Sequence, residues 1–362
     1  MSAVALSQQQ SETYTTSDGV SFKIETVVSN LDVPWSLAFE GEDLYFTERR
    51  GKIWVLRRME SKRTLIADID EVFADGEGGL MGLAFHPEFK RNNFLYLSYS
   101  YRDGSRTLNK VVRFKLSENR LESNRTIVGG LPGSGIHNGC RIRFGPDRKL
   151  YITTGDAGRR VIAQDMSSLG GKVLRVNDDG SIPSDNPFGN SPVYSIGHRN
   201  GQGLDWHPTL RFLLESEHGP SGFDGPGGGD EINIVEAGKN YGWPKIHHKE
   251  SAEGMMSPVA EFTPAVAPGG ASFCTGKGIP QFKNHLFVAT LRGKRLMRIV
   301  LNPKSGRQVI GIENLLTGVF GRLRDVIEGP DGYLYFSTSN RDGRGVPHET
   351  DDRIMRIVPS NP

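Results

Sequence analysis

The stretch that decides the fold is Phe144-Gly-Pro-Asp-Arg-Lys-Leu-Tyr-Ile152, in which an apolar residue leads into a tight turn and then into an apolar strand. Further copies of this turn-plus-strand pattern begin at Phe39, Phe85, Trp206, Gly278 and Gly329. They recur about every 45 to 70 residues, and a repeat of this period is typical of propellers and arrays. Six sheets of four antiparallel strands would use the whole chain, so the sequence predicts an all-β, six-bladed β-propeller.

Strand-like runs between these copies support the same architecture, and no amphipathic helix of useful length appears. The predicted strands include 21–28, 95–101, 109–116, 150–154, 286–290, 296–301, 333–338 and 353–358. Closing the ring removes exposed sheet edges, so we expect Ser21–Val28 to complete the sheet that ends in Arg353–Val358. No linker divides the chain. Residues 17–362 are therefore expected to form one domain after a flexible N-terminal segment, residues 1–16.

Composition excludes several classes of partner. The 362 residues carry 44 Lys plus Arg against 42 Asp plus Glu, a balance that gives no field for nucleic acid or an anionic membrane. No apolar stretch is long enough to span a bilayer. The polar N-terminus lacks the regions of a signal peptide, which indicates a cytoplasmic protein or a mature form with its signal removed. Cys140 and Cys274 have no metal-ligand spacing, and buried free thiols are favoured over a disulfide.

The first candidate for chemistry is a pair formed by His137 and Asp156. His137 lies before a predicted strand pair and Asp156 lies after it, so the hairpin should return the two to the same face of the propeller. A carboxylate beside an imidazole fixes its tautomer and makes it a better proton acceptor. A histidine that merely caps a turn explains this segment alone equally well.

Two further loops carry polar groups beside glycines. Gly197–Gly203 contains Arg199, a forked cationic donor, and Asn200, an amide that can donate and accept hydrogen bonds. The loop with Gly219-Pro220 ends in Asp230-Glu231 and can supply both carboxylates and backbone carbonyls, the oxygens that calcium prefers. Its spacing is not that of an EF-hand, and a solvated acidic turn is the alternative interpretation.

A last group is cationic. Arg322 and Arg324 alternate on one face of a predicted strand, and Arg292 lies in the preceding repeat. Paired cations that face one cavity repel each other unless an anion sits between them. On these residues alone, a surface strand with salt bridges to Asp325 or Glu328 is favoured.

Together these motifs resemble the soluble dehydrogenases that depend on pyrroloquinoline quinone (PQQ), namely soluble glucose dehydrogenase and, more closely, the shorter aldose sugar dehydrogenases. The most specific pieces are Gly79–Phe89, Ile196–Gly203 and Asp230–Pro244, whose order and spacing match. The resemblance covers nearly the whole chain. It implies a six-bladed propeller that binds PQQ and calcium, oxidises the C1 hydroxyl of aldose sugars to the lactone by hydride transfer, and passes electrons to an external small-molecule or protein acceptor.

The resemblance also implies roles for individual residues. His137 would be the general base for the anomeric hydroxyl, oriented by Asp156, while Arg199 and Asn200 would contact PQQ and polarise its quinone oxygen. The implied residues around the PQQ carboxylates are Arg292, Arg322 and Arg324. The carbonyls of Gly219 and Pro220 would hold the calcium that binds PQQ, and the positions implied for a further, structural calcium are Glu231 and Tyr241.

The sequence departs from that family in ways that limit the expectations. Glu77 replaces a cofactor-contacting glutamine, so a carboxylate would face an anionic ligand unless it were protonated or turned away. Arg292 replaces a lysine. Shorter late loops mean that substrate range and oligomeric state are not carried over, with a monomer slightly favoured. The family implies a periplasmic or extracellular location. The alternatives are a calcium-dependent propeller lactonase and a non-enzymatic propeller that binds protein or carbohydrate.

Overall fold

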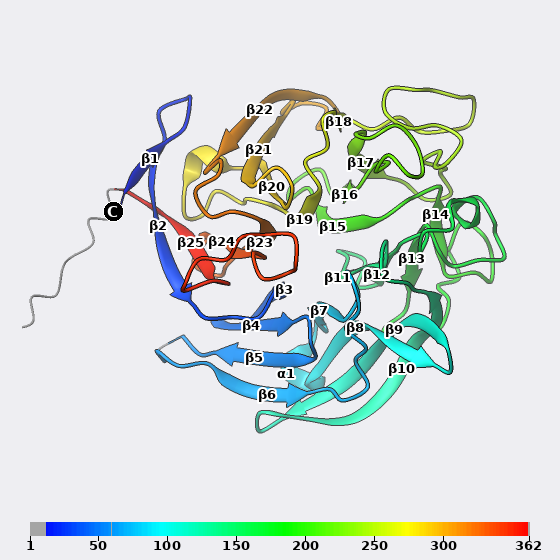
Figure 1. Ribbon diagram of the computed structural model, residues 1–362, viewed down its shortest axis with the longest axis horizontal. Coiled ribbons are helices and arrows are strands. Elements are labelled where there is room, and N and C mark those ends of the chain that lie inside the picture. The colour runs from blue at the N-terminus through cyan, green and yellow to red at the C-terminus, as the bar shows by residue number, and fades with distance from the viewer. Residues whose placement is uncertain (1–11, 59, 361–362) are drawn as a thin grey trace, which may run out of the picture.

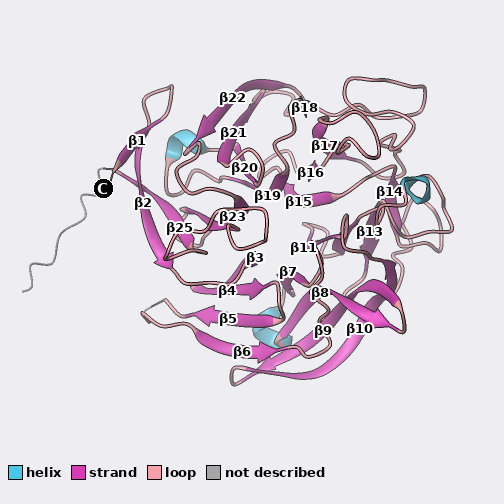
Figure 2. Ribbon diagram, in the orientation of Figure 1, coloured by secondary structure: helices cyan, strands magenta, loops and turns pink. Residues whose placement is uncertain are grey.

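A computed structural model describes residues 12–58 and 60–360, which form six sheets around a central axis (Figure 1). Each sheet contains four antiparallel strands, and one of them has a fifth strand at its edge. Strands make up nearly all of the regular structure, as Figure 2 shows. The predicted six-bladed β-propeller with four antiparallel strands per blade is confirmed.

The blades follow one another along the chain. The first blade contains β3 (Pro34–Glu40), β4 (Asp43–Glu48), β5 (Lys52–Leu56) and β6 (Thr64–Asp68). The second contains β7 (Leu80–Phe85), β8 (Phe94–Asp103), β9 (Arg106–Ser117) and β10 (Arg120–Pro132). The third contains β11 (Gly139–Phe144), β12 (Leu150–Thr154), β13 (Lys172–Val176) and β14 (Val193–Ile196). The next two contain β15 (Gly201–Trp206), β16 (Leu213–Glu217), β17 (Asp230–Val235) and β18 (Ala260–Phe262), then β19 (Pro268–Phe273), β20 (Leu286–Thr290), β21 (Arg295–Leu301) and β22 (Val309–Leu315).

The sixth blade joins the two ends of the chain. Its strands are β23 (Leu323–Glu328), β24 (Leu334–Thr338) and β25 (Ile354–Pro359), followed by β2 (Ser21–Val28) and β1 (Thr13–Thr15). β2 pairs with β25 in antiparallel register, with Phe22 opposite Pro359 and Ile24 opposite Ile357. The expected closure by residues 21–28 is therefore confirmed. The propeller also begins earlier than residue 17, because β1 pairs with β2; residues 1–11 of the predicted flexible segment lie outside the described residues.

The first strand of each blade lies at the axis. β3 contacts β7, β7 contacts β11, and the ring continues through β15, β19 and β23 back to β3. The apolar core lies between neighbouring blades, where for example Ile53 and Val55 of the first blade pack with Leu95 and Leu97 of the second. Where a strand is covered on both faces, as β20 is along its whole length, its sequence reads as a nearly continuous apolar run, and burying each such side chain stabilises the fold by ~1.5–3 kcal/mol.

Helices are confined to short connections: α1 (Phe89–Asn92) and the 3₁₀ turns η1 (Arg160–Ala163) and η2 (Pro280–Phe282). Among the described residues, no helix has the length and hydropathy that a membrane span requires. Cys140 and Cys274 are both buried free thiols, which confirms that interpretation.

Candidate functional site

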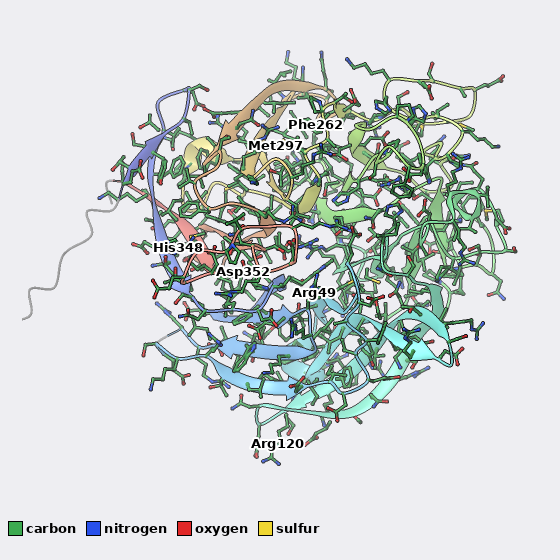
Figure 3. The ribbon with its side chains drawn as sticks, viewed as in Figure 1. Arg49, Arg120, Phe262, Met297, His348 and Asp352 are labelled. Atoms are coloured by element: carbon green, nitrogen blue, oxygen red, sulfur yellow. The ribbon has the colours of Figure 1, made fainter. Side chains whose placement is uncertain are left out.

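The first strands and the loops at one of their ends enclose a cavity of about 430 Å3. All six blades contribute to its wall, either directly or through the loop that precedes an inner strand. Figure 3 labels Arg49, one of the lining residues, near the middle of the ring. The wall carries six arginines, namely Arg49, Arg199, Arg292, Arg322, Arg324 and Arg344, against three carboxylates, Glu77, Asp230 and Asp342. This excess of positive charge favours an anionic ligand.

His137 and Asp156 meet at this cavity. Their Nδ1 and Oδ1 atoms are 2.7 Å apart, and His137 is 4 % exposed on the cavity wall. The hairpin of β11 and β12 brings them together, with Gly139 opposite Thr154, as the sequence predicted. Because Asp156 takes the Nδ1 position, a neutral imidazole keeps its lone pair at Nε2. The pair can therefore accept a proton from a ligand.

Asp156 is itself fixed by a residue that the sequence analysis did not single out. Trp243 donates from Nε1 to Asp156 Oδ2 at 2.9 Å, and Gly158 N donates to Oδ1 at 2.8 Å. Both carboxylate oxygens thus have donors in a fully buried position. The Trp243 ring also lies 5.4 Å from the Arg199 guanidinium, so this side chain contacts both Asp156 and Arg199.

Arg199 lies in the cavity wall, whereas Asn200 does not. Arg199 donates from Nε to Asp224 Oδ2 at 2.8 Å and from Nη2 to Ser221 Oγ at 3.0 Å, which leaves N–H groups for a ligand. Burial acts to raise the pKa of Asp224, but the bond from Arg199 brings it below its ordinary value. Asn200 lies behind the wall, where its Oδ1 accepts from Gly139 N and Gln202 Nε2, each at 3.0 Å.

The predicted cationic face of β23 is present. Arg322 and Arg324 both line the cavity, and Arg322 is paired with Asp342 at 2.8 Å. Arg324 donates to Gln202 Oε1 at 3.2 Å, but its buried Nε has no partner among the described residues. Burial lowers the pKa of Arg324 to about 10. A buried guanidinium with an unused donor requires an acceptor, and a ligand carboxylate would supply one.

The loop between β16 and β17 forms another part of the cavity wall, and one of its carbonyls, Pro220 O, accepts from Gly228 N at 3.2 Å. Gly219 and Pro220 line the cavity, and a Cβ at Gly219 would lie 2.2 Å from Gly229 O, so only glycine fits. Asp230 fixes this loop by accepting from Gly219 N at 2.8 Å and from Val266 N at 2.6 Å. Carbonyls held beside a carboxylate are a donor set that fits calcium.

Glu231 and Tyr241 lie elsewhere, beside a buried acidic cluster in the fourth blade. The cluster consists of His198, Glu215 and Glu217, whose ligand atoms all lie within 4.8 Å of one another. Asn233 Nδ2 joins Glu217 and Glu231 with bonds of 3.3 Å and 3.1 Å, and the Tyr241 ring stacks on His198 with ring centroids 4.7 Å apart. The predicted metal residues therefore belong to two separate places.

The acidic cluster contains acceptors without donors. Oε1 of Glu215 and Oδ1 of Asn233 have no hydrogen-bond partner among the described residues, whereas Oε2 of Glu215 lies 2.8 Å from His198 Nδ1. Burial raises the pKa values of Glu215 and Glu231 well above the ordinary carboxyl range. Such a site fits a cation. The signal that could have revealed Glu215 is the spacing Glu215-Ser-Glu217, which places two carboxylates on one face of a strand.

Glu77 is neither protonated nor turned away from the cavity. Its Oε2 accepts from His137 N at 3.1 Å, and its Oε1 accepts from Arg344 Nη1 at 2.7 Å. Burial opposes its ionisation, but His218 and Arg344 outweigh that effect and the pKa of Glu77 falls to about 2. The carboxylate that the sequence placed against an anionic ligand is thus ionised and paired with an arginine from the last loop.

Comparison with known proteins identifies the family. The model of the Glucose / Sorbosone dehydrogenase family matches residues 31–350. The chain belongs to this family. Aldose sugar dehydrogenase YliI of Escherichia coli is 33% identical over 363 residues, covering 93% of each chain.

Two solved structures of family members superpose closely on the chain. An oxidoreductase of Thermus thermophilus, described as a glucose dehydrogenase, is 42% identical with a TM-score of 0.86, covering 93% of this chain and 100% of its own. The PQQ-bound aldose sugar dehydrogenase of Streptomyces coelicolor is 36% identical with a TM-score of 0.81, covering 93% and 98%. The resemblance to the soluble PQQ-dependent sugar dehydrogenases is confirmed.

Proposed function

We propose that this chain is a PQQ-dependent aldose sugar dehydrogenase that oxidises the C1 hydroxyl of an aldose to the lactone. The observation that carries the proposal is that a buried His137–Asp156 pair opens onto the same cavity as six arginines. A proton acceptor next to a strongly cationic cavity suits the oxidation of a neutral sugar by an anionic cofactor. The alternative lactonase would need carboxylate and amide ligands converging on the axis, and it leaves the arginines without a role.

His137 takes the proton of the C1 hydroxyl at Nε2, and Asp156 stabilises the imidazolium that forms. When bound, PQQ supplies a quinone carbon that accepts the hydride from C1. Arg199 would offer N–H donors to the quinone oxygen of PQQ, on which negative charge develops. Arg324, with its unpartnered Nε, together with Arg322 and Arg292, holds the carboxylates of the cofactor.

Calcium has two proposed sites. The carbonyls of Gly219 and Pro220 would hold the calcium that acts with the cofactor. A second ion lies with Glu231 at the buried cluster and strengthens the fourth blade. Two buried oxygens without a hydrogen-bond partner among the described residues, Glu215 Oε1 and Asn233 Oδ1, support this second site. We also propose an exported protein, periplasmic or extracellular, that passes its electrons to an external acceptor.

Reconstitution tests the function. The purified chain with PQQ and calcium should reduce dichlorophenolindophenol when glucose or another aldose is added, and should produce the lactone in equal amount. Omitting PQQ is the matched control and should abolish the signal. Failure to reduce the dye with PQQ present, together with lactone hydrolysis in calcium alone, would favour the lactonase.

A further inference from the structure

Phe223 is a large exposed apolar side chain that lies against His137, a residue of the cavity wall. It is 67% exposed, and its ring stacks on the ring of His137, with centroids 6.0 Å apart and an interplanar angle of 25°. Ser221, two residues earlier in the chain, lines the cavity. An isolated exposed apolar residue is ordinary on a protein surface. Phe223 differs because it stands directly against the proposed general base.

The backbone around Phe223 is held in place from several sides. The next residue, Asp224, accepts from Arg199 Nε at 2.8 Å and from Ser221 N at 2.9 Å, and its carbonyl accepts from Arg160 Nη1 at 3.2 Å. These bonds fix the loop between β16 and β17 on both sides of the ring. The exposed part of the Phe223 ring is therefore a preformed surface beside His137.

The other neighbour of His137 at the cavity edge is polar. Glu77 accepts from His137 N at 3.1 Å and is paired with Arg344, whose side chain is 58% exposed. His137 is thus contacted by an aromatic ring through its imidazole and by a charged pair through its backbone. A pyranose ring offers the matching chemistry, because it has an apolar face of C–H groups and a rim of hydroxyls that both donate and accept.

We propose that Phe223 is the apolar platform of a sugar subsite at the mouth of the cavity, where it receives the C–H face of an aldopyranose while the Glu77–Arg344 pair binds the ring hydroxyls. The inference rests on the proposed function, since it takes the sugar to be the substrate whose C1 hydroxyl meets His137. The subsite selects pyranose rings by shape and contributes to sugar affinity. It does not take part in the proton transfer.

The test compares Phe223→Ala and Phe223→Tyr with the wild type and with Ile310→Ala, which removes another exposed apolar side chain, 55% exposed, from β22. In the reconstituted enzyme, Phe223→Ala should raise KM for glucose about three- to tenfold, since an aromatic contact of this kind has that effect on affinity, with kcat within about twofold. Phe223→Tyr should restore KM, and Ile310→Ala should change nothing. PQQ affinity, measured by absorbance titration, should be the same in all four proteins.

An unchanged KM in Phe223→Ala would overturn the proposal. A fall in kcat at constant KM would also overturn it, because Phe223 would then act on His137 and not on the sugar. If the wild type neither bound PQQ nor reduced the dye, the proposed function would fail independently. Saturation-transfer NMR of glucose with wild type and Phe223→Ala would still decide the subsite, through loss or retention of the sugar signal.

Discussion

The two ring nitrogens of His137 have different surroundings: Asp156 occupies Nδ1, while the ring itself lies on the cavity wall. His137→Ala removes the base and leaves the arginines that bind the cofactor. We expect kcat to fall by about 10²–10⁴-fold, the usual contribution of general base catalysis, while the Kd for PQQ stays within a few-fold. Stopped-flow dye reduction and absorbance titration measure the two quantities. Unchanged turnover would remove His137 from the mechanism.

Trp243→Phe keeps the aromatic packing but removes the Nε1–H that Asp156 accepts at 2.9 Å. A buried carboxylate oxygen without its donor should cost about 1–3 kcal/mol of unfolding free energy. Without this donor the negative charge of Asp156 is less dispersed, so the carboxylate attracts the imidazolium form of His137 more strongly. Protonation of His137 is then favoured, and the acidic limb of the kcat/KM profile should move to higher pH.

The matched control for Trp243 is Trp54→Phe, which removes a similar bond, 2.8 Å, to Glu48 in the first blade. It should lower stability without moving the acidic limb. Urea denaturation and pH–rate profiles of both variants decide the matter. A limb that shifts equally in both proteins, or in neither, would contradict a positioning role for Trp243.

At the scale of the element, β23 brings a buried cation to the axis, which lowers the stability of the cofactor-free protein. Arg324 is buried with an unpartnered Nε, and burial lowers its pKa. Arg324→Met should therefore weaken PQQ binding at least tenfold but leave the apo protein as stable as before or about 1–4 kcal/mol more stable. Arg298→Met, on β21, is the control: it breaks ion pairs with Asp18 and Glu313, so it should lower stability without changing PQQ affinity.

Thermal unfolding of both variants with and without PQQ separates these effects. If Arg324→Met destabilised the apo protein as strongly as Arg298→Met, the guanidinium of Arg324 would be a structural group and not a ligand-binding one.

The acidic cluster predicts how the metal-free fourth blade responds to pH. Burial raises the pKa of Glu215 from 4.5 to about 7 and that of Glu231 from 4.5 to about 8, while the two glutamates around His198 outweigh its burial and raise its pKa from 6.5 to about 10. Raised folded pKa values mean that the folded state binds more protons than the unfolded one. Their stabilising contribution is complete below pH 4.5 and is lost progressively up to about pH 10.

In EGTA, Tm should therefore fall as the pH rises from 5 to 9, and calcium should restore Tm most at the alkaline end because it replaces the departing protons. Differential scanning calorimetry at constant ionic strength measures this. Glu215→Gln, which retains the shape but not the charge, should reduce the calcium effect. A Tm in EGTA that rises toward pH 9 would contradict the assignment of the cluster as a cation site.

For the whole molecule, ring closure depends on β2. Phe22 is 1% exposed and packs against Phe282 of the fifth blade, with ring centroids 6.5 Å apart, so it links two blades. Phe22→Ala should cost about 3–5 kcal/mol of unfolding free energy, as loss of a buried aromatic does. The denaturant midpoint should fall accordingly, whereas the exposed Ile310→Ala should stay within about 0.5 kcal/mol of the wild type. Equal midpoints for the two variants would show that β2 does not hold the ring.

The sequence predicted what depends on local pattern. Turn chemistry and strand periodicity are local, so the blade number followed from copies such as Phe144–Ile152, and the His137–Asp156 pair followed from one hairpin. The contacts between distant loops have no such signal. Trp243 reaches Asp156 across 87 positions and Arg344 reaches Glu77 across 267, so only the folded ring reveals them. Asn200 illustrates the same limit. Its position behind the cavity wall depends on its bond from Gly139 N of the neighbouring blade, which the local sequence does not reveal.

The pairing of β2 with β25 imposes an order on biogenesis. β2 stays without β25 until residues 354–359 have been made, and contacts so far apart in sequence form slowly. Arg322 and Arg324 belong to the same late segment. A nascent chain that still lacks this segment therefore has no complete cavity, and the cofactor can be captured only after residues 322–359 have been made.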